Sequence, residues 1–93
     1  MTTVNELIGK AVIGSKAHTI GYVNGVEVDL ATWQVTHLHV TLTNEATKEL
    51  GFKKPFMGAI NVCLPVSLIQ AVADIVALNK DTPELKDVIE PRG

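Results

Sequence analysis

The clearest pattern along the chain is an alternation of apolar and polar residues between Trp33 and Thr43. Side chains of a strand point alternately to its two faces, so this segment is predicted to be a strand with one buried face. The buried face carries Leu38, Val40 and Leu42. The opposite face carries Trp33, Val35, His37, His39, Thr41 and Thr43.

A second extended segment runs from His18 to Leu30 and is rich in β-branched and aromatic residues. Asn24-Gly25 in its middle allows two interpretations, a tight hairpin turn or a bulge within one long strand. We favour the bulge, because a hairpin here would leave very short strands on both sides. With the strand from Trp33 to Thr43, this segment is then expected to form a long, curved antiparallel pair.

Shorter elements fill the rest of the chain. Residues 44–51 are predicted to form one or two helical turns, capped by Asn44 or Thr43 and stopped by Gly51. A short strand is expected between Gly9 and Gly14 and another over residues 59–64, whereas residues 71–78 fit a helix or a strand. Residues 82–89 are predicted to form a helix with Thr82 as its cap and Pro83 at its first position, followed by a tail over residues 90–93.

Length and composition favour one globular domain. The 93 residues are 46% hydrophobic and 19% charged, so we expect a single domain over residues 1–93 with a core spanning about residues 7–89. A net charge of −2 provides no field that would attract nucleic acid. No apolar run approaches the ~20 residues that cross a bilayer, so direct membrane insertion is not expected. A single cysteine, Cys63, fits a reducing cytoplasm.

Four short motifs stand out along the chain: Leu7-Ile8-Gly9-Lys10-x-Val12, His18-Thr19-Ile20-Gly21-x-Val23, Val62-x-Leu64-Pro65 and Asp74-Ile75-Val76-x-Leu78. Together they resemble the PRC-barrel family over nearly the whole chain, about residues 7–85. The resemblance implies a mainly β fold, a small and strongly bent antiparallel β-barrel with one or two short helices, in which residues 71–78 form a strand. The turn after Asp29 departs from the family pattern, since many members have a glycine there and this chain has Leu30-Ala31-Thr32-Trp33.

Among members of this family, the sequence is most similar to stand-alone archaeal proteins of about this length, which have been linked to FtsZ-based cell division alongside its SepF-type anchor. The resemblance implies a homodimeric adaptor in the cytoplasm, recruited to the division site, whose partners are a SepF-type anchor or other PRC-barrel proteins. It transfers no catalytic residues. A second hypothesis is an RNA- or ribosome-associated factor, as in the ribosome-maturation branch, but the acidic charge and the lack of room for a second domain weigh against it.

Two regions are predicted to form the partner or dimer interface. Trp33 shares a strand face with His37 and His39, and a tryptophan beside a turn is expected to be partly exposed. A loop with two phenylalanines, two lysines and a proline is either a docking site or a plug whose aromatic rings fold back onto the barrel. The loop residues are Phe52, Lys53, Lys54, Pro55, Phe56 and Met57.

Catalytic, metal and cofactor sites are not expected. His37 and His39 are spaced to share a metal, but nothing in the sequence places His18 or Cys63 near them as a third ligand. Cys63 lies between Val62 and Leu64 and is expected to be a buried, inert thiol. Paired acidic residues such as Glu27 and Asp29 need a water-excluding pocket for acid–base chemistry, and a small filled barrel leaves little room for one.

Overall fold

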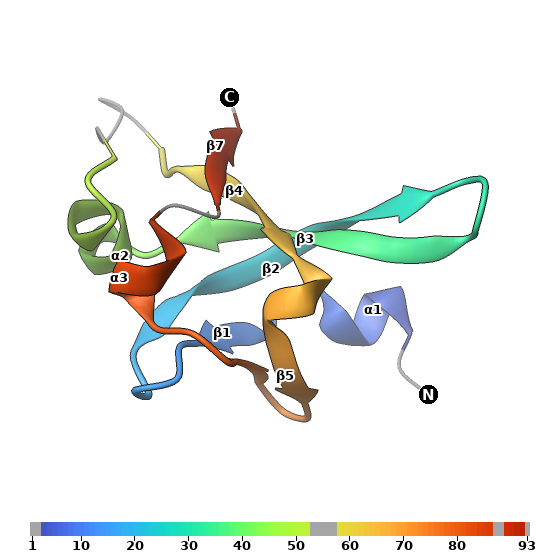
Figure 1. The fold of residues 1–93 in the computed structure, drawn as a ribbon, viewed down its shortest axis with the longest axis horizontal. Coiled ribbons are helices and arrows are strands. Elements are labelled where there is room, and N and C mark those ends of the chain that lie inside the picture. The colour runs from blue at the N-terminus through green and yellow to red at the C-terminus, as the bar shows by residue number, and fades with distance from the viewer. Residues whose placement is uncertain (1–2, 53–57, 87–88, 93) are drawn as a thin grey trace.

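The computed structural model is mainly β, with three short α-helices among the residues it describes (Figure 1). The described residues are 3–52, 58–86 and 89–92, and for residues 90–92 the backbone alone is described. The helices are α1 (Val4–Leu7), α2 (Asn44–Glu49) and α3 (Thr82–Leu85), and one 3-10 turn, η1, covers Val66–Leu68. The strands are β1 (Ala11–Ile13), β2 (Thr19–Asp29), β3 (Gln34–Leu42), β4 (Asn61–Pro65), β5 (Ile69–Val72), β6 (Val76–Leu78) and β7 (Glu90–Arg92).

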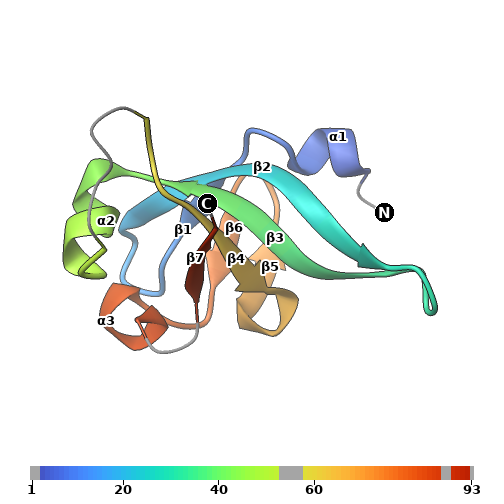
Figure 2. The ribbon, with the colours of Figure 1, turned by 90° about the horizontal axis from the view of Figure 1, so that it is seen from above.

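The strands form one strongly bent sheet in the order β5-β6-β1-β2-β3-β4-β7 (Figure 2). The pair of β1 and β6 is parallel and the other pairs are antiparallel, so the sheet is mixed and the purely antiparallel prediction is wrong. The sheet is not closed, since β5 and β7 stand at its two ends. The parallel pair joins segments far apart in the chain, because β6 follows β2, β3, β4 and β5 in sequence and yet lies between β5 and β1 in the sheet.

The segment around Asn24-Gly25 is a bulge within one continuous strand, as the sequence favoured. Val23 pairs with Val40 and Gly25 pairs with His39, so Asn24 is the extra residue. Because of this insertion, Val23 and Val26 face the core although they are three positions apart. A second irregularity, at Thr36, lies between the pairs Glu27–His37 and Val28–Val35 and interrupts the predicted alternation near the start of β3.

Helix α2 follows β3 directly and ends where the sequence placed its stop. Its N-cap is Thr43, whose hydroxyl accepts a hydrogen bond from the Ala46 N–H at 3.1 Å, so of the two predicted caps the structure selects Thr43. Gly51 after the helix has a φ of 77°, a left-handed conformation that glycine adopts at little cost. One face of the helix reaches the core through Ala46, and Leu50 just beyond it is also buried.

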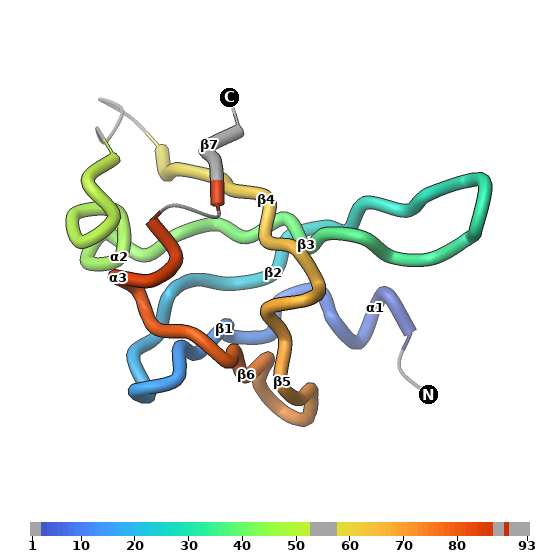
Figure 3. Tube along the Cα trace, in the orientation of Figure 1, coloured from blue at the N-terminus to red at the C-terminus, as the bar shows by residue number. Residues whose placement is uncertain are grey.

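The segment 71–78, left open between helix and strand, is extended. It contributes the end of β5 and the whole of β6, which pair with each other in an antiparallel hairpin. Val76 and Leu78 are buried, whereas Val72 and Ile75 remain about 40% and 41% exposed. Figure 3 shows this hairpin on the lower edge of the molecule, on the opposite side of the chain trace from β7.

The C-terminal prediction needs three corrections. Asp81, not Thr82, precedes the first helical residue of α3, so Pro83 occupies the second helical position. The helix ends at Leu85 rather than Ile89, although both Leu85 and Ile89 are buried in the core. The predicted tail contains β7, whose backbone pairs with β4 from Asn61 to Cys63.

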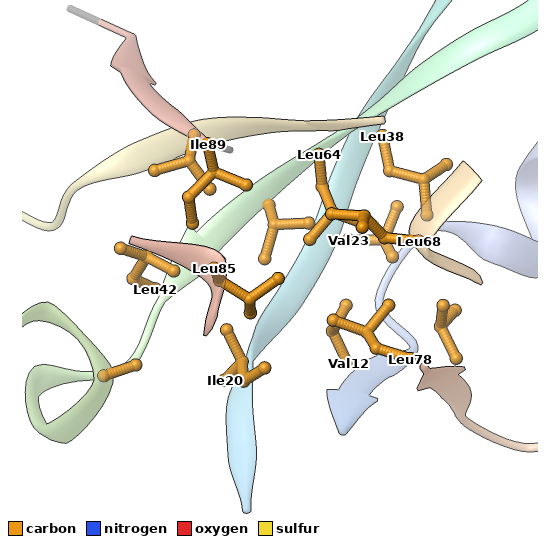
Figure 4. Close-up of a cluster of buried hydrophobic side chains, with 14 of the residues drawn as sticks. Val12, Ile20, Val23, Leu38, Leu42, Leu64, Leu68, Leu78, Leu85 and Ile89 are labelled. Atoms are coloured by element: carbon orange, nitrogen blue, oxygen red, sulfur yellow. The ribbon is translucent and has the colours of Figure 1, made fainter. Parts of the chain in front are cut away.

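The core lies on the concave side of the bent sheet and is closed by α2, α3 and η1 (Figure 4). The predicted face of β3 is confirmed, since Leu38, Val40 and Leu42 are each 4% exposed or less. Core residues are contributed by most elements of the chain, as the labelled side chains in Figure 4 show: Val12, Ile20, Val23, Leu38, Leu42, Leu64, Leu68, Leu78, Leu85 and Ile89. Within the described ranges, every helix is too short or too polar to reach across a bilayer.

Candidate functional site

The hairpin of β2 and β3 projects from the body of the molecule as an arm. Strand β4 accompanies β3 only from His37 to Thr41, so residues 28–36 pair with no strand but each other. Figures 1 and 2 show this arm extending from the rest of the sheet, on the side opposite to α2 and α3. We refer to residues 28–36 as the arm. Its free position makes it the most accessible apolar part of the described chain.

The tip of the arm is a tight loop that presents two large apolar side chains. The Trp33 N–H donates to the Asp29 carbonyl at 2.6 Å, and the Asp29 carboxylate accepts from the Ala31 N–H at 2.8 Å. Leu30 is 69% exposed and Trp33 is 77% exposed. The predicted exposure of Trp33 is therefore confirmed, and it exceeds what the sequence suggested.

Trp33 also has an unusual backbone conformation. Its φ is 57°, in the left-handed region that glycine and asparagine enter readily and that bulky residues rarely adopt. Trp33 is the last residue of the loop, immediately before β3 begins at Gln34. The tryptophan therefore occupies a backbone position that would suit glycine.

The histidines that share a predicted face with Trp33 lie at the base of the arm instead of its tip. His37 is four residues from Trp33, which corresponds to roughly 13 Å along an extended strand. His37 and His39 both lie where β3 is already paired with β4, opposite Pro65 and Cys63. The structure therefore separates the predicted interface into an apolar tip and a polar base.

The polar base is a cluster of four side chains on the outer face of the sheet, away from the core. The Glu27 carboxylate is its centre. Oε1 of Glu27 lies 3.0 Å from Nε2 of His39 and 3.4 Å from Sγ of Cys63. Oε2 of the same carboxylate lies 3.5 Å from Nδ1 of His37. We refer to Glu27, His37, His39 and Cys63 as the outer cluster.

The outer cluster forms because three strands come into one register. His39 stands opposite Cys63 in the pair of β3 and β4, and Glu27 stands opposite His37 in the pair of β2 and β3. The bulge at Asn24 is essential, since without the extra residue Glu27 would point to the core face. Gly25 stands opposite His39 and has no side chain that would cover the imidazole.

Sequence reasoning found the histidines but missed their partners. Nothing in the sequence placed a third potential ligand near His37 and His39, whereas in the structure Glu27, His39 and Cys63 form a group whose potential ligand atoms all lie within 4.8 Å of one another. The signal for Glu27 was available in the predicted bulge, which sets its face. No local signal existed for Cys63, because its position depends on the register of β3 with β4.

Burial differs within the outer cluster. Cys63 is 8% exposed, as its apolar neighbours predicted, but its thiol contacts a carboxylate instead of hydrocarbon alone. The Glu27 side chain is 32% exposed and the two histidine side chains are each 37% exposed. The cluster is therefore half-buried, with a sulfur at its floor and polar groups reaching solvent.

Other predicted positions contribute less. Phe52 is half-buried and packs against the core, in agreement with the interpretation that it folds back onto the sheet. Lys53, Lys54, Pro55, Phe56 and Met57 lie outside the described residues. An open groove beside α2 is lined by His18, Tyr22, Glu45 and Glu49 among others. Asp29 lies in the arm and is engaged in the turn, so it forms no carboxylate pair with Glu27.

No protein-family model matches this sequence, and the comparison with curated proteins finds no match.

Proposed function

We propose that this protein is a non-enzymatic protein-interaction module that associates with a second copy of itself through the tip of the arm. The observation that carries the proposal is Trp33, whose side chain is 77% exposed and whose φ is 57°. A large aromatic side chain in this position contributes little packing to its own domain. Aromatic residues of this kind concentrate binding energy when a partner covers them.

The backbone of Trp33 strengthens this argument. A non-glycine residue in a sparsely populated region of backbone conformation costs on the order of 1–3 kcal/mol. Glycine or asparagine would relieve that cost without losing a buried contact, because Trp33 is exposed. The benefit of the indole ring therefore lies outside the isolated chain, in an interface.

A second copy fits the arm because the arm has little charge. Between Val28 and Thr36 the only ionisable side chain is Asp29, and its carboxylate is hydrogen-bonded to the turn. Two identical arms therefore meet around a two-fold axis without like charges facing each other across the apolar contact. Val28, Leu30 and Trp33, which are 41%, 69% and 77% exposed, supply the apolar surface.

The wider role that we propose follows from the resemblance to stand-alone PRC-barrel proteins. The bent sheet with its enclosed apolar core is the part of the structure that supports a barrel of this type. In this proposal the homodimer is an adaptor in the cytoplasm of an archaeal cell, recruited to the division site by a SepF-type anchor or by another PRC-barrel protein.

The test is the oligomeric state of two matched variants. Trp33→Asn removes the indole ring from the arm and suits the left-handed backbone, whereas Ile75→Asn removes an apolar side chain of 41% exposure from the β5–β6 turn. Light scattering should give twice the chain mass for the wild type and for Ile75→Asn, and the chain mass for Trp33→Asn. A wild type that is monomeric at high concentration, or a Trp33→Asn variant that stays dimeric, would refute the proposal.

The single tryptophan provides a second readout. Dilution of the wild type should shift the fluorescence emission to longer wavelength as the indole becomes exposed to water. Emission that is independent of concentration would contradict burial of Trp33 in a dimer.

The adaptor role needs its own experiment. The wild type, Trp33→Asn and Ile75→Asn are each used as bait for affinity capture from the native cell. The captured proteins should be division proteins. Recovery of ribosomal proteins in their place would support the RNA-associated alternative and overturn the adaptor role.

A further inference from the structure

We propose that Glu27, His39 and Cys63 form a binding site for a divalent transition metal, for which Zn²⁺ is the best match. The carboxylate of Glu27, Nε2 of His39 and Sγ of Cys63 supply three ligands from three neighbouring strands. The site lies at the base of the arm, away from the exposed tip. The inference does not depend on the proposed dimer.

The donor set favours zinc over other common ions. Zinc in proteins is bound by cysteine sulfur, histidine nitrogen and carboxylate oxygen, and this group provides one of each. Magnesium and calcium prefer sites made of oxygen alone, so the thiol and the imidazole disfavour them. Among the described residues, this is the only group of three or more histidine, cysteine or acidic side chains close enough to share an ion.

The distances are close to those of a tetrahedral site. With zinc bonds of about 2.0–2.3 Å, two ligand atoms of a tetrahedron lie about 3.3–3.8 Å apart. Oε1 of Glu27 lies 3.0 Å from Nε2 of His39 and 3.4 Å from Sγ of Cys63, and the three atoms all lie within 4.8 Å of one another. Small side-chain rotations therefore suffice to place an ion between them.

The metal replaces hydrogen bonds that already join these side chains. The Cys63 thiol donates to Glu27 Oε1, and on binding its proton passes to solvent while the thiolate takes the metal. The imidazole of His39 and the carboxylate of Glu27 supply the other two ligand atoms. Water occupies the fourth position, since the half-buried cluster is open to solvent on the side of Glu27 and His39.

His37 acts as a positioning residue for this site. Its Nδ1 lies 3.5 Å from Oε2 of Glu27 and 3.0 Å from the Thr36 hydroxyl. These contacts hold the carboxylate so that its other oxygen faces His39 and Cys63. Partners of this kind orient the ligands of a metal site, and their loss weakens metal binding by about 10–100-fold.

Metal binding at this place ties together three strands. Glu27 belongs to β2, His39 to β3 and Cys63 to β4, and the arm begins directly beyond Glu27 and His37. A bound ion therefore fixes the base from which the arm projects. Because the folded state binds the metal more tightly than the unfolded chain, zinc is expected to raise the thermal melting temperature.

The experiment uses Co²⁺ as a spectroscopic substitute for zinc on the reduced full chain. The wild type should bind one Co²⁺ per chain, with visible bands of tetrahedral cobalt and a near-ultraviolet charge-transfer band from the thiolate. Zn²⁺ should displace the cobalt and abolish both. Cys63→Ser should lose the charge-transfer band, and His39→Ala should weaken binding by at least about tenfold.

Two further variants separate a built site from general surface binding. His18→Ala removes a histidine outside the cluster, 63% exposed beside Asp81, and should bind cobalt as the wild type does. His37→Ala should keep the charge-transfer band but bind about tenfold more weakly. Circular dichroism of each variant confirms that it is folded. A wild type without the thiolate band, or equal affinities for the wild type, Cys63→Ser and His39→Ala, would overturn the proposal.

Discussion

Gly21 on β2 lies directly against the backbone carbonyl of Thr41 on β3, with no room for a side chain between them. A Cβ atom on Gly21 would collide with that carbonyl and would lie 2.7 Å from Cγ1 of Val40. Glycine is therefore required at position 21 for steric reasons, although its own conformation is not left-handed.

Replacement of Gly21 by alanine should destabilise the protein by about 1–3 kcal/mol, the typical cost of overpacking a tight interior. Gly25→Ala is the matched control on the same strand, since a Cβ there would meet His39 at 3.7 Å, an ordinary contact. Gly25→Ala should leave stability within about 0.5–1 kcal/mol of the wild type. Urea unfolding measures the free energy of unfolding of both variants. An equal loss of stability in Gly21→Ala and Gly25→Ala would contradict the close contact of Gly21 with the Thr41 carbonyl.

Thr43→Ala should reduce stability by about 1 kcal/mol, because it removes the hydroxyl that caps α2. Asn44→Ala should have a much smaller effect, since Asn44 is already the first residue of the helix and is exposed. Chemical denaturation distinguishes the two caps that the sequence left open. A larger loss for Asn44→Ala than for Thr43→Ala would show that the helix begins one residue later.

Leu85→Ala should cost about 2–5 kcal/mol, the range for truncating a fully buried leucine. Helix α3 has only four residues and is too short to be stable by itself, so its contribution depends on Leu85 packing into the core. Lys86→Ala, an exposed change at the next residue, should stay within about 0.5 kcal/mol. Equal melting temperatures for Leu85→Ala and Lys86→Ala would contradict the packing of Leu85 into the core.

Much of the local structure was predictable because it depends on neighbouring residues. The alternation from Trp33 to Thr43 predicted which face of β3 is buried, and Leu38, Val40 and Leu42 confirm it. The Asn24-Gly25 bulge and the stop at Gly51 were likewise predicted correctly, and Gly51 has the left-handed backbone that glycine adopts at a helix end. The cap of α3 was misplaced by one residue because Asp81 and Thr82 are both good capping residues.

The candidate sites show the same division. The sequence predicted that Trp33 would be exposed. It did not predict that Trp33 lies on the free arm while His37 and His39 lie beside β4, because that depends on where the pairing of β3 with β4 ends. The meeting of Cys63 with Glu27 depends on two strand registers at once. A shift of one residue in either register would turn one partner to the other face of the sheet.

The sequence by itself determined β2, β3 and β4 as strands, the buried face of β3 from Leu38 to Leu42, the bulge and the short helix after β3, because each depends on interactions between residues close in the chain. Tertiary structure decided the parallel pair of β1 with β6, the pairing of β7 with β4 and the assembly of the outer cluster. The physical reason is that these contacts join segments far apart in sequence. Their registers are fixed by burial of the shared core and by no local turn.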